Sequence, residues 1–320
     1  MQRLVLIDGN AILHRAYHAL PPLTNRSGEQ IGAVYGFSTM LFRVIAGLKP
    51  NYLAVVFDLA KPTFRHHEYF GYQSHRPKMD LELVGQIDKV HEVLKAMGVP
   101  IYGVEGFEAD DVIGTIAKQS LKSKKGKKKT ALVDEVIIVT GDRDLFQLIG
   151  PKTKVYAPAR GLSEGEIFDQ KKVYQKMKVR PDQIVDYKGL SGDASDNYPG
   201  VPGVGPKTAA SLLQKYKTFK NLFRHVDGLP ENLARKLTEG VELAELSRKL
   251  AQIVTDVPFK FDLHQCEFKF TDEEKERLTK KFKELGFKSL IRRLEGSDSK
   301  AGSQKKEAGL SKSNSQQELF

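Results

Sequence analysis

The run Val136-Ile137-Ile138-Val139-Thr140-Gly141-Asp142-Arg143-Asp144 joins an uninterrupted apolar stretch to two carboxylates. Apolar residues at successive positions are typical of a strand that is buried on both faces of a parallel sheet. Two other runs have the same form, because residues 4–7 lead into Asp8 and residues 53–57 lead into Asp58. The three runs predict a sheet with aspartates at the ends of its strands.

Helix-period segments lie between these runs, for example Ile31, Val34, Leu41, Val44 and Leu48. This alternation predicts an α/β fold with helices flanking a mostly parallel sheet, and we expect it to cover residues 1–175. Residues 176–295 read as a mainly helical second lobe. Residues 296–320 are rich in Ser, Lys, Gly and Gln, which predicts a disordered tail.

The composition favours a soluble protein with a polyanionic partner. Lys and Arg outnumber Asp and Glu by 51 to 40, giving a net charge of +11. No apolar run approaches the roughly 20 residues that span a bilayer, and the N-terminus does not resemble a signal peptide. The single cysteine, Cys266, suits a reducing compartment. We therefore expect a cytoplasmic monomer with no membrane contact.

Carboxylates fall in five groups, three of them at the strand ends. A fourth group, residues 108–111, opens an apolar helix, and a fifth places two aspartates three residues apart on one helical face. Because ligands gather beyond the carboxyl ends of parallel strands, these groups can converge. The acidic residues in question are Asp8, Asp58, Glu108, Asp110, Asp111, Asp142, Asp144, Asp193 and Asp196.

Each acid taken alone has an ordinary explanation as a helix cap or a turn residue. Five groups at matching places favour a metal site, because two carboxylates about 4 Å apart repel by roughly 4 kcal/mol at an effective dielectric of 20. Crowded carboxylates must either take up protons or bind cations. Oxygen ligands without nearby Cys or His favour Mg²⁺ first and Mn²⁺ second.

The acidic motifs at residues 5–10, 54–58, 108–114, 140–144 and 192–197 resemble those of the 5′-nuclease domain of bacterial DNA polymerase I. That family includes stand-alone 5′-nucleases and is related to flap endonucleases; the similarity spans about residues 3–292. It implies a PIN-like nuclease lobe with two Mg²⁺ ions, for which Mn²⁺ can substitute. By resemblance, Asp8, Asp58, Glu108 and Asp110 hold one ion, and Asp142, Asp144, Asp193 and Asp196 hold the other, with Asp111 in support.

Residues 190–216 resemble the helix-hairpin-helix element of the same family, which grips duplex phosphates without reading bases. Glycines allow close approach to a ligand, and a helix start offers free N–H groups to an anion. The DNA-contacting residues implied here are Gly203, Gly205, Lys207 and Thr208. The resemblance also allows a K⁺ ion at the hairpin. A plain Gly-Pro turn between helices is the alternative.

Residues 60–85 are rich in basic and aromatic side chains and align with the family's helical arch, where rings and cations hold a single strand. A solvated surface helix is the alternative. The residues expected to contact DNA are Arg65, Tyr72, Arg76 and Lys78, together with Arg15 near the 5′ strand. Arg76 is also expected to act at the scissile phosphate, with His75 and Lys78 as alternatives. Relatives commonly carry Lys where this chain has Gln73, which predicts slower turnover.

Two segments lie outside the globular pattern. Residues 122–129 contain six lysines and serve either as a solvated loop or as an extra phosphate contact. The terminal Gln316-Gln317-Glu318-Leu319-Phe320 resembles the peptide by which bacterial enzymes bind the DNA sliding clamp. Gln316, Leu319 and Phe320 would then contact the clamp, although a five-residue match also arises by chance.

Together these features predict a metal-dependent 5′-3′ exonuclease and flap endonuclease. Its expected substrate is branched or flapped duplex DNA, including RNA-primed DNA, in replication and repair. The alternative, which Gln73 favours, is a structure-specific DNA-binding protein with impaired catalysis. A small PIN-type ribonuclease is a further alternative, opposed by the arch and the hairpin.

Overall fold

A six-stranded sheet in the order β3-β2-β1-β4-β5-β6 forms the centre of the computed structural model. The structure describes residues 1–77, 79–121, 132–158 and 165–295. The first five strands are parallel, and β6 is antiparallel to β5. Their bounds are β1 Arg3–Asp8, β2 Tyr52–Val56, β3 Ile101–Tyr102, β4 Glu135–Val139, β5 Thr153–Pro158 and β6 Gly165–Phe168. The predicted mostly parallel α/β fold is confirmed.

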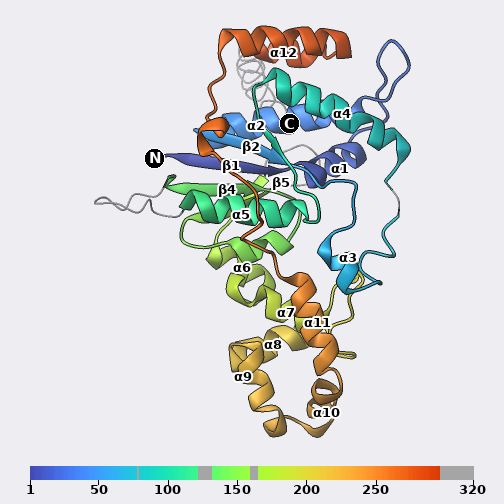
Figure 1. Ribbon diagram of the computed structural model, residues 1–320, viewed down its shortest axis with the longest axis vertical. Coiled ribbons are helices and arrows are strands. Elements are labelled where there is room, and N and C mark those ends of the chain that lie inside the picture. Colours follow the sequence, from blue (N-terminus) through green and yellow to red (C-terminus); the bar gives the residue numbers. More distant parts are fainter. Residues whose placement is uncertain (78, 122–131, 159–164, 296–320) are drawn as a thin grey trace, which may run out of the picture.

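Helices cover both faces of this sheet (Figure 1). One face packs against α1 (Gly9–Ala19), α2 (Gly32–Leu48) and α4 (Leu81–Ala96), and the opposite face against α5 (Ala109–Leu121). Successive strand residues point to opposite faces, so Val5 and Ile7 join the first core while Leu4 and Leu6 join the second. Burial on both faces explains why the strands are apolar without alternation.

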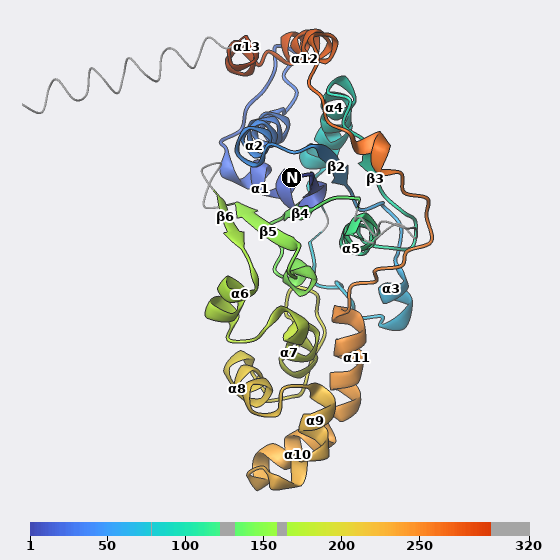
Figure 2. The same cartoon turned by 90° about the vertical axis from the view of Figure 1, so that its left-hand side faces the viewer.

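A helical lobe extends away from the sheet (Figures 1 and 2). It contains α6 (Gln170–Met177), α7 (Ile184–Ser191), α8 (Pro206–Tyr216), α9 (Phe219–Arg224), α10 (Glu231–Glu239) and α11 (Val241–Ala251). Helices α7 and α11 approach closely at Gly189, where an added Cβ would lie 2.0 Å from Cγ of Arg248. Arg248 in turn donates to Asp186 at 2.8 Å, which fixes α7 against α11.

After α11 the chain returns to the sheet. The helical lobe was predicted to continue to residue 295, so it ends earlier than expected. Phe268 donates its backbone N–H to the carbonyl of Asn51, and α12 (Asp272–Leu285) and α13 (Lys288–Leu294) follow. Figure 2 shows both helices at the end of the molecule opposite the helical lobe. Leu278 and Phe282 are fully buried in the core shared with α2 and α4. Burying these few apolar residues holds a highly charged helix on the lobe that contains the sheet.

The predicted arch, residues 60–85, is only partly helical. Helix α3 (Phe64–Glu68) is followed by turns through Arg76, and α4 begins at Leu81. Lys78, the lysine run at 122–129 and the tail residues Gln316, Leu319 and Phe320 lie outside the described residues. Among the described helices, none combines the length and apolar character needed to cross a membrane.

Candidate active site

One pocket lies beyond the carboxyl ends of β1, β2 and β4 and collects acids from every predicted group. Seven of the nine predicted acids line it, namely Asp8, Asp58, Glu108, Asp110, Asp142, Asp144 and Asp196. The parallel strands end at the same edge of the sheet, so residues far apart in sequence meet there. The pocket also takes side chains from α1, α3 and the turns that follow α3.

Asp8 is fixed where β1 passes into α1. Its carboxylate caps the helix by accepting from the N–H of Ala11 at 3.0 Å, and it accepts from Oγ1 of Thr140 at 2.7 Å. Thr140 lies at the end of β4, so the two central strands are joined at the acidic pocket. Burial, followed by the charges of Asp58 and Asp142, raises the pKa of Asp8 to about 7.

Asp58 joins the end of β2 to the start of α5. Its side chain accepts from the N–H of Ala109 at 2.7 Å, and its own N–H donates to Oδ1 of Asn10 at 2.8 Å. Asp58 borders the open side of the pocket and keeps an exposed surface. The loss of solvent around its carboxyl still raises its pKa, while the hydrogen bond from Ala109 and the charge of Arg76 oppose the rise.

Glu108 and Asp110 enter the pocket from the start of α5. Glu108 accepts hydrogen bonds from Thr63 at 3.4 Å and Tyr72 at 3.1 Å. Burial is the main cause that raises the pKa of Glu108 to about 7, with Arg65 opposing the shift. Burial also raises the pKa of Asp110 far above its usual value, and the charge of Asp142 is the next cause. The carboxyls are therefore close enough to disfavour one another's ionisation.

Asp144, Asp193 and Asp196 form a compact oxygen cluster. One carboxylate oxygen from each lies within 4.8 Å of the other two, close enough to share one metal ion. Asp196 accepts from Nη2 of Arg76 at 2.6 Å, and the ammonium of Lys188 contacts both Asp144 and Asp193. Hard divalent cations prefer such an all-oxygen donor set. The cluster joins η1 (Asp144–Leu148) to the loop after α7.

The surroundings shift the pKa values of Asp144 and Asp193 in opposite directions. Burial, opposed by Lys188, raises the pKa of Asp144 to about 7. Burial also acts on Asp193, but Lys188 and two hydrogen bonds from Ser195 outweigh it and hold the pKa of Asp193 below its usual value. Asp193 does not line the acidic pocket beyond the strand ends. Its contacts are with Lys188 of α7 and with Ser195 in the loop that follows α7.

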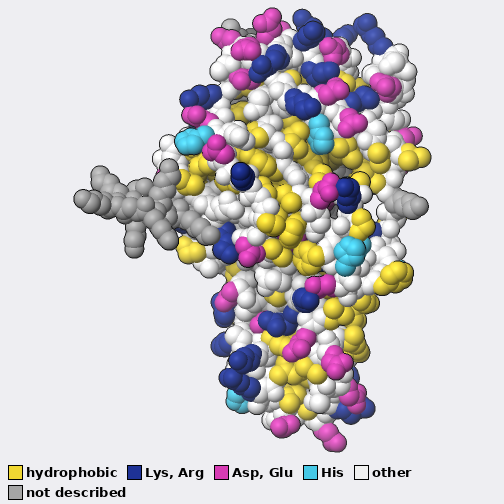
Figure 3. Space-filling view, viewed as in Figure 1, with side chains coloured by type: hydrophobic (Ala, Val, Ile, Leu, Met, Phe, Trp, Pro, Cys, Tyr) yellow, Lys and Arg dark blue, Asp and Glu magenta, His cyan; other side chains and the backbone are white. Residues whose placement is uncertain are grey.

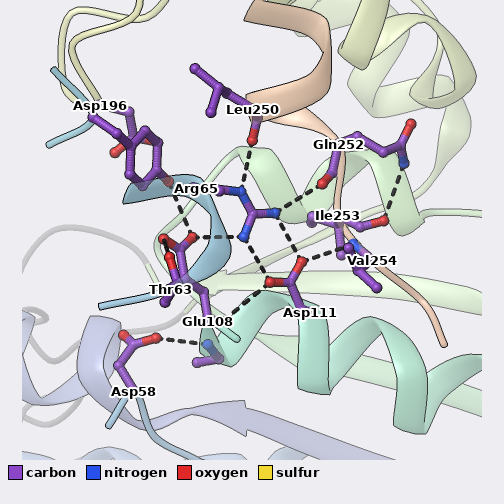
Figure 4. Close-up of polar contacts among 12 residues, drawn as sticks. Asp58, Thr63, Arg65, Glu108, Asp111, Asp196, Leu250, Gln252, Ile253 and Val254 are labelled. Atoms are coloured by element: carbon purple, nitrogen blue, oxygen red, sulfur yellow. Dashed lines mark hydrogen bonds and ion pairs between the residues drawn. The ribbon is translucent and has the colours of Figure 1, made fainter. Parts of the chain in front are cut away.

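Asp111 does not line the pocket, which corrects its predicted place as a supporting metal residue. Figure 4 shows it bound to Arg65 instead. Its side chain is fully buried and accepts hydrogen bonds from both Nη atoms of Arg65, at 2.7 and 2.9 Å. It also accepts the N–H groups of Glu108 at 3.2 Å and Val254 at 2.8 Å. Both oxygens are thus engaged. Successive helical residues diverge, so Asp110 lines the pocket while Asp111 pairs with Arg65.

Arg65 is 1% exposed, which corrects its predicted role as a DNA contact. Its guanidinium also donates to the carbonyls of Leu250 and Gln252, each at 2.8 Å, and lies 3.3 Å from Glu108 (Figure 4). These bonds connect α3, the start of α5, the end of α11 and the chain that follows it. Arg65 therefore holds the acidic helix start against the helical lobe.

Tyr72 and Arg76, the other arch residues predicted to contact DNA that the structure describes, do reach the pocket. Tyr72 is buried beside Glu108, whereas the side chain of Arg76 is half exposed and pairs with Asp196. Gln73 also donates to Asp196, at 3.2 Å. Arg15 is half-buried on α1 and is not among the pocket-lining residues.

Sequence reasoning missed two residues of this site. His14 lines the pocket from α1, and its position one helical turn after Asn10 could have identified it. Burial, with His18 and Arg76 nearby, lowers the pKa of His14. Lys188 reaches the acidic cluster from α7. Nothing in its local sequence distinguishes it from a surface lysine.

The predicted hairpin is the loop between α7 and α8. Gly200 has φ +61°, and a Cβ there would lie 2.2 Å from the backbone N of Gly192, so glycine is required. Gly203, Gly205 and Lys207 are exposed at the start of α8, and Thr208 is half-buried beside them. This arrangement suits an anion at a helix start.

The surface next to the hairpin is basic. Residues 197–226 contain five Lys or Arg and no Asp or Glu. Figure 3 shows Lys and Arg side chains gathered along the edge of the helical lobe formed by α8 and α9. Such a surface attracts a phosphate backbone whatever its base sequence.

Family models match almost the whole described chain. The model for the 5′-3′ exonuclease N-terminal resolvase-like domain matches residues 3–178. The model for the 5′-3′ exonuclease C-terminal SAM fold matches residues 179–274. The boundary between them falls just after α6.

Curated relatives agree with these matches. DNA polymerase I of Bacillus caldotenax is 40% identical over 299 residues, which are 93% of this chain and 33% of that protein. The chain thus spans about a third of that relative. A 5′-3′ exonuclease of Aquifex aeolicus is 37% identical over 295 residues, 92% of this chain and 96% of that protein.

Solved structures share the fold at low identity. The phage T5 D15 protein crystallised with metal ions has a TM-score of 0.64 and 18% identity, covering 88% of this chain and 99% of D15. The catalytic core of Rad2 in complex with a DNA substrate has a TM-score of 0.59 and 16% identity, covering 92% and 90% of the two chains. With two family models and a relative matched over nearly its full length, this chain belongs to the 5′-3′ exonuclease family.

Proposed function

We propose that this chain is a metal-dependent 5′-3′ exonuclease and flap endonuclease that hydrolyses phosphodiester bonds of DNA. The observation that carries the proposal is the pocket in which seven carboxylates meet beyond the strand ends. Family membership supports the reaction class, and the pocket supports the choice of residues. Branched or flapped duplex DNA is the proposed substrate, including RNA-primed DNA, in replication and repair.

Two divalent ions, Mg²⁺ with Mn²⁺ as a substitute, fit the donor set. One would be held by Asp8, Asp58, Glu108 and Asp110, and the other by Asp142, Asp144, Asp193 and Asp196. The raised pKa values of Asp8 and Asp110 support this assignment, because these carboxyls disfavour ionisation without a cation. Bound ions would activate a water molecule and stabilise the leaving oxygen during in-line attack. Asp111 is not included, since Arg65 occupies both of its oxygens.

The chain's own residues orient the ligands and the phosphate. Thr140 and the start of α1 hold Asp8, and Ala109 holds Asp58. Arg76 lies half exposed at the pocket and supplies a positive charge for the scissile phosphate. Gln73 occupies the neighbouring position without a charge.

DNA would approach along the hairpin and the basic edge of α8 and α9. Gly203, Gly205, Lys207 and Thr208 would hold the duplex backbone, and a K⁺ ion could be held at the same loop. The tail residues Gln316, Leu319 and Phe320 are proposed to bind the sliding clamp. Deleting residues 316–320 should then abolish clamp binding in a titration while leaving flap hydrolysis unchanged; intact clamp binding would reject this assignment.

The second candidate is a structure-specific DNA-binding protein with impaired catalysis. Gln73 favours it, because relatives commonly have a lysine there and this side chain brings no charge to the phosphate. The number of carboxylates gathered in the pocket opposes it.

A labelled 5′-flap substrate separates the two candidates. Cleavage is expected with Mg²⁺ and should be lost with EDTA or in Asp142→Asn. Asp88→Asn, which changes an exposed acid on α4, is the matched control and should cut at the wild-type rate. Binding of the flap without cleavage by the wild type would favour the second candidate. Efficient cutting of single-stranded RNA alone would reject both.

A further inference from the structure

Lys188 lies inside the acidic cluster. It projects from α7, its side chain is 10% exposed, and its ammonium contacts a carboxylate oxygen of Asp144 and one of Asp193. The other oxygen of Asp193 accepts from the N–H of Ser195 at 2.7 Å. The lysine therefore lies between two of the three acids that could share a metal ion.

We propose that Lys188 is a built-in counter-ion that takes the place of the second divalent ion in the metal-free protein. The ion enters the cluster only by displacing the Lys188 ammonium from Asp144 and Asp193. This inference rests on the proposed function, because it assumes that the cluster binds a divalent ion during the nuclease cycle. It assigns to Lys188 control over the affinity of that ion.

The dimensions of the cluster favour exchange over coexistence. Mg²⁺ binds oxygens at about 2.1 Å, so two ligands on opposite sides of it lie roughly 4.2 Å apart. The cluster oxygens lie within 4.8 Å of one another, which leaves room for one cation between them. An ammonium also needs close contact with both oxygens, at about 2.7–2.9 Å. A divalent ion and Lys188 therefore compete for the same position.

The charges around the cluster lead to the same conclusion. Three carboxylates lie together, and the cations that contact them are Lys188 and Arg76. Arg76 pairs with Asp196 from the arch side, so Lys188 neutralises Asp144 and Asp193 from the helical lobe. Without Lys188, the partly buried carboxylates of Asp144 and Asp193 would lose the cation that contacts both of them, and Arg76 would remain only on Asp196. Such a site attracts a divalent ion more strongly.

The position of the Lys188 stem is set by the fold. Gly189 allows close contact between α7 and α11, and Asp186 is held by Arg248 and by the N–H of Phe219, both at 2.8 Å. The backbone of α7 is thus fixed, whereas the four-carbon stem of a lysine has several rotatable bonds. The ammonium can move out of the cluster without a rearrangement of the helix.

The first test uses the wild-type protein without DNA. Reductive methylation followed by peptide mass spectrometry reports how accessible each lysine is. Mg²⁺ should increase labelling of Lys188 several-fold relative to the EDTA sample. Labelling of Lys171, which is exposed on α6, should stay unchanged. Equal labelling of Lys188 with and without bound Mg²⁺ would overturn the proposal.

The second test measures Mn²⁺ binding to variants in the absence of DNA. Lys188→Met should bind the second Mn²⁺ more tightly by about tenfold or more, the equivalent of one charge-assisted hydrogen bond lost by the competitor. Lys188→Arg keeps the charge and should bind like the wild type, as should the surface control Lys171→Met. Unchanged or weaker Mn²⁺ binding by Lys188→Met would overturn the proposal.

The two tests separate this inference from the proposed function. A wild-type protein that binds no divalent ion would reject the metal-dependent function itself. A wild-type protein that binds two ions while Lys188 stays protected rejects only the exchange. The labelling test remains decisive if Lys188→Met does not fold, because it needs no substitution.

Discussion

Replacing Arg65 by methionine should strongly destabilise the protein. The change leaves the fully buried carboxylate of Asp111 without its cation and removes the donors to the carbonyls of Leu250 and Gln252. Removing one partner of a buried ion pair costs about 3–5 kcal/mol, a large share of the roughly 5–15 kcal/mol that stabilises a domain. Glu108 should also lose its position, because Arg65 lies 3.3 Å from it.

Urea unfolding of a double-mutant cycle measures this effect. Arg65→Met and Asp111→Leu should each be severely destabilised, and the double variant should be much less destabilised than the sum of the two. The exposed pair Arg180 and Asp182 is the matched control, and Arg180→Met should cost no more than about 1 kcal/mol. A cost below about 1 kcal/mol for Arg65→Met, or simple additivity in the cycle, would refute the reasoning.

Three further predictions follow from the site and the hairpin. Asp8 and Glu108 have pKa values raised to about 7 from 3.8 and 4.5, so the metal-free fold binds more protons than the unfolded chain between those limits. Its melting temperature should therefore fall as the pH rises through this window, and Mg²⁺ should remove the fall. A melting temperature that rises with pH in the presence of EDTA would contradict the assignment. Gln73→Lys should raise the single-turnover rate of flap cleavage, and an unchanged rate would show that the missing charge is not limiting. Gly200→Ala should lower stability by about 1–3 kcal/mol in urea unfolding, whereas Gly228→Ala, which meets nothing within 4 Å, should cost much less; equal losses would contradict the need for a positive φ.

The strands that carry the acids were predictable because each is a continuous apolar run ending in aspartate. Strands β3, β5 and β6 were not predicted. Strand β3 has only two residues, β5 mixes buried and half-buried positions, and two of the four β6 residues are exposed. The return of α12 to the nuclease lobe was also missed. Its apolar positions, including Leu278 and Phe282, are few among many charges, and such a helix reads as part of a solvated lobe.

The sequence could predict that the acids meet in one site, but not which of them bind cationic side chains instead of lining the pocket. Asp110 and Asp111 are adjacent, and the sequence gives no sign that one faces the pocket while the other binds Arg65. Arg65 itself lies in a basic segment that suggested a DNA contact. Its partners Leu250 and Gln252 are far away in the sequence, as is Val254, which donates to Asp111. Only the fold reveals these connections. Lys188 escaped notice for the same reason.

The number and position of bound ions test the central claim most directly. Anomalous scattering from a crystal of the wild-type protein soaked in Mn²⁺ should show two peaks in the acidic pocket, about 3.5–4 Å apart. One peak should lie beside Asp8 and Asp110, and the other among Asp144, Asp193 and Asp196. An acidic pocket that stays empty at saturating Mn²⁺, or ions bound only elsewhere on the surface, would contradict a metal-dependent nuclease centre.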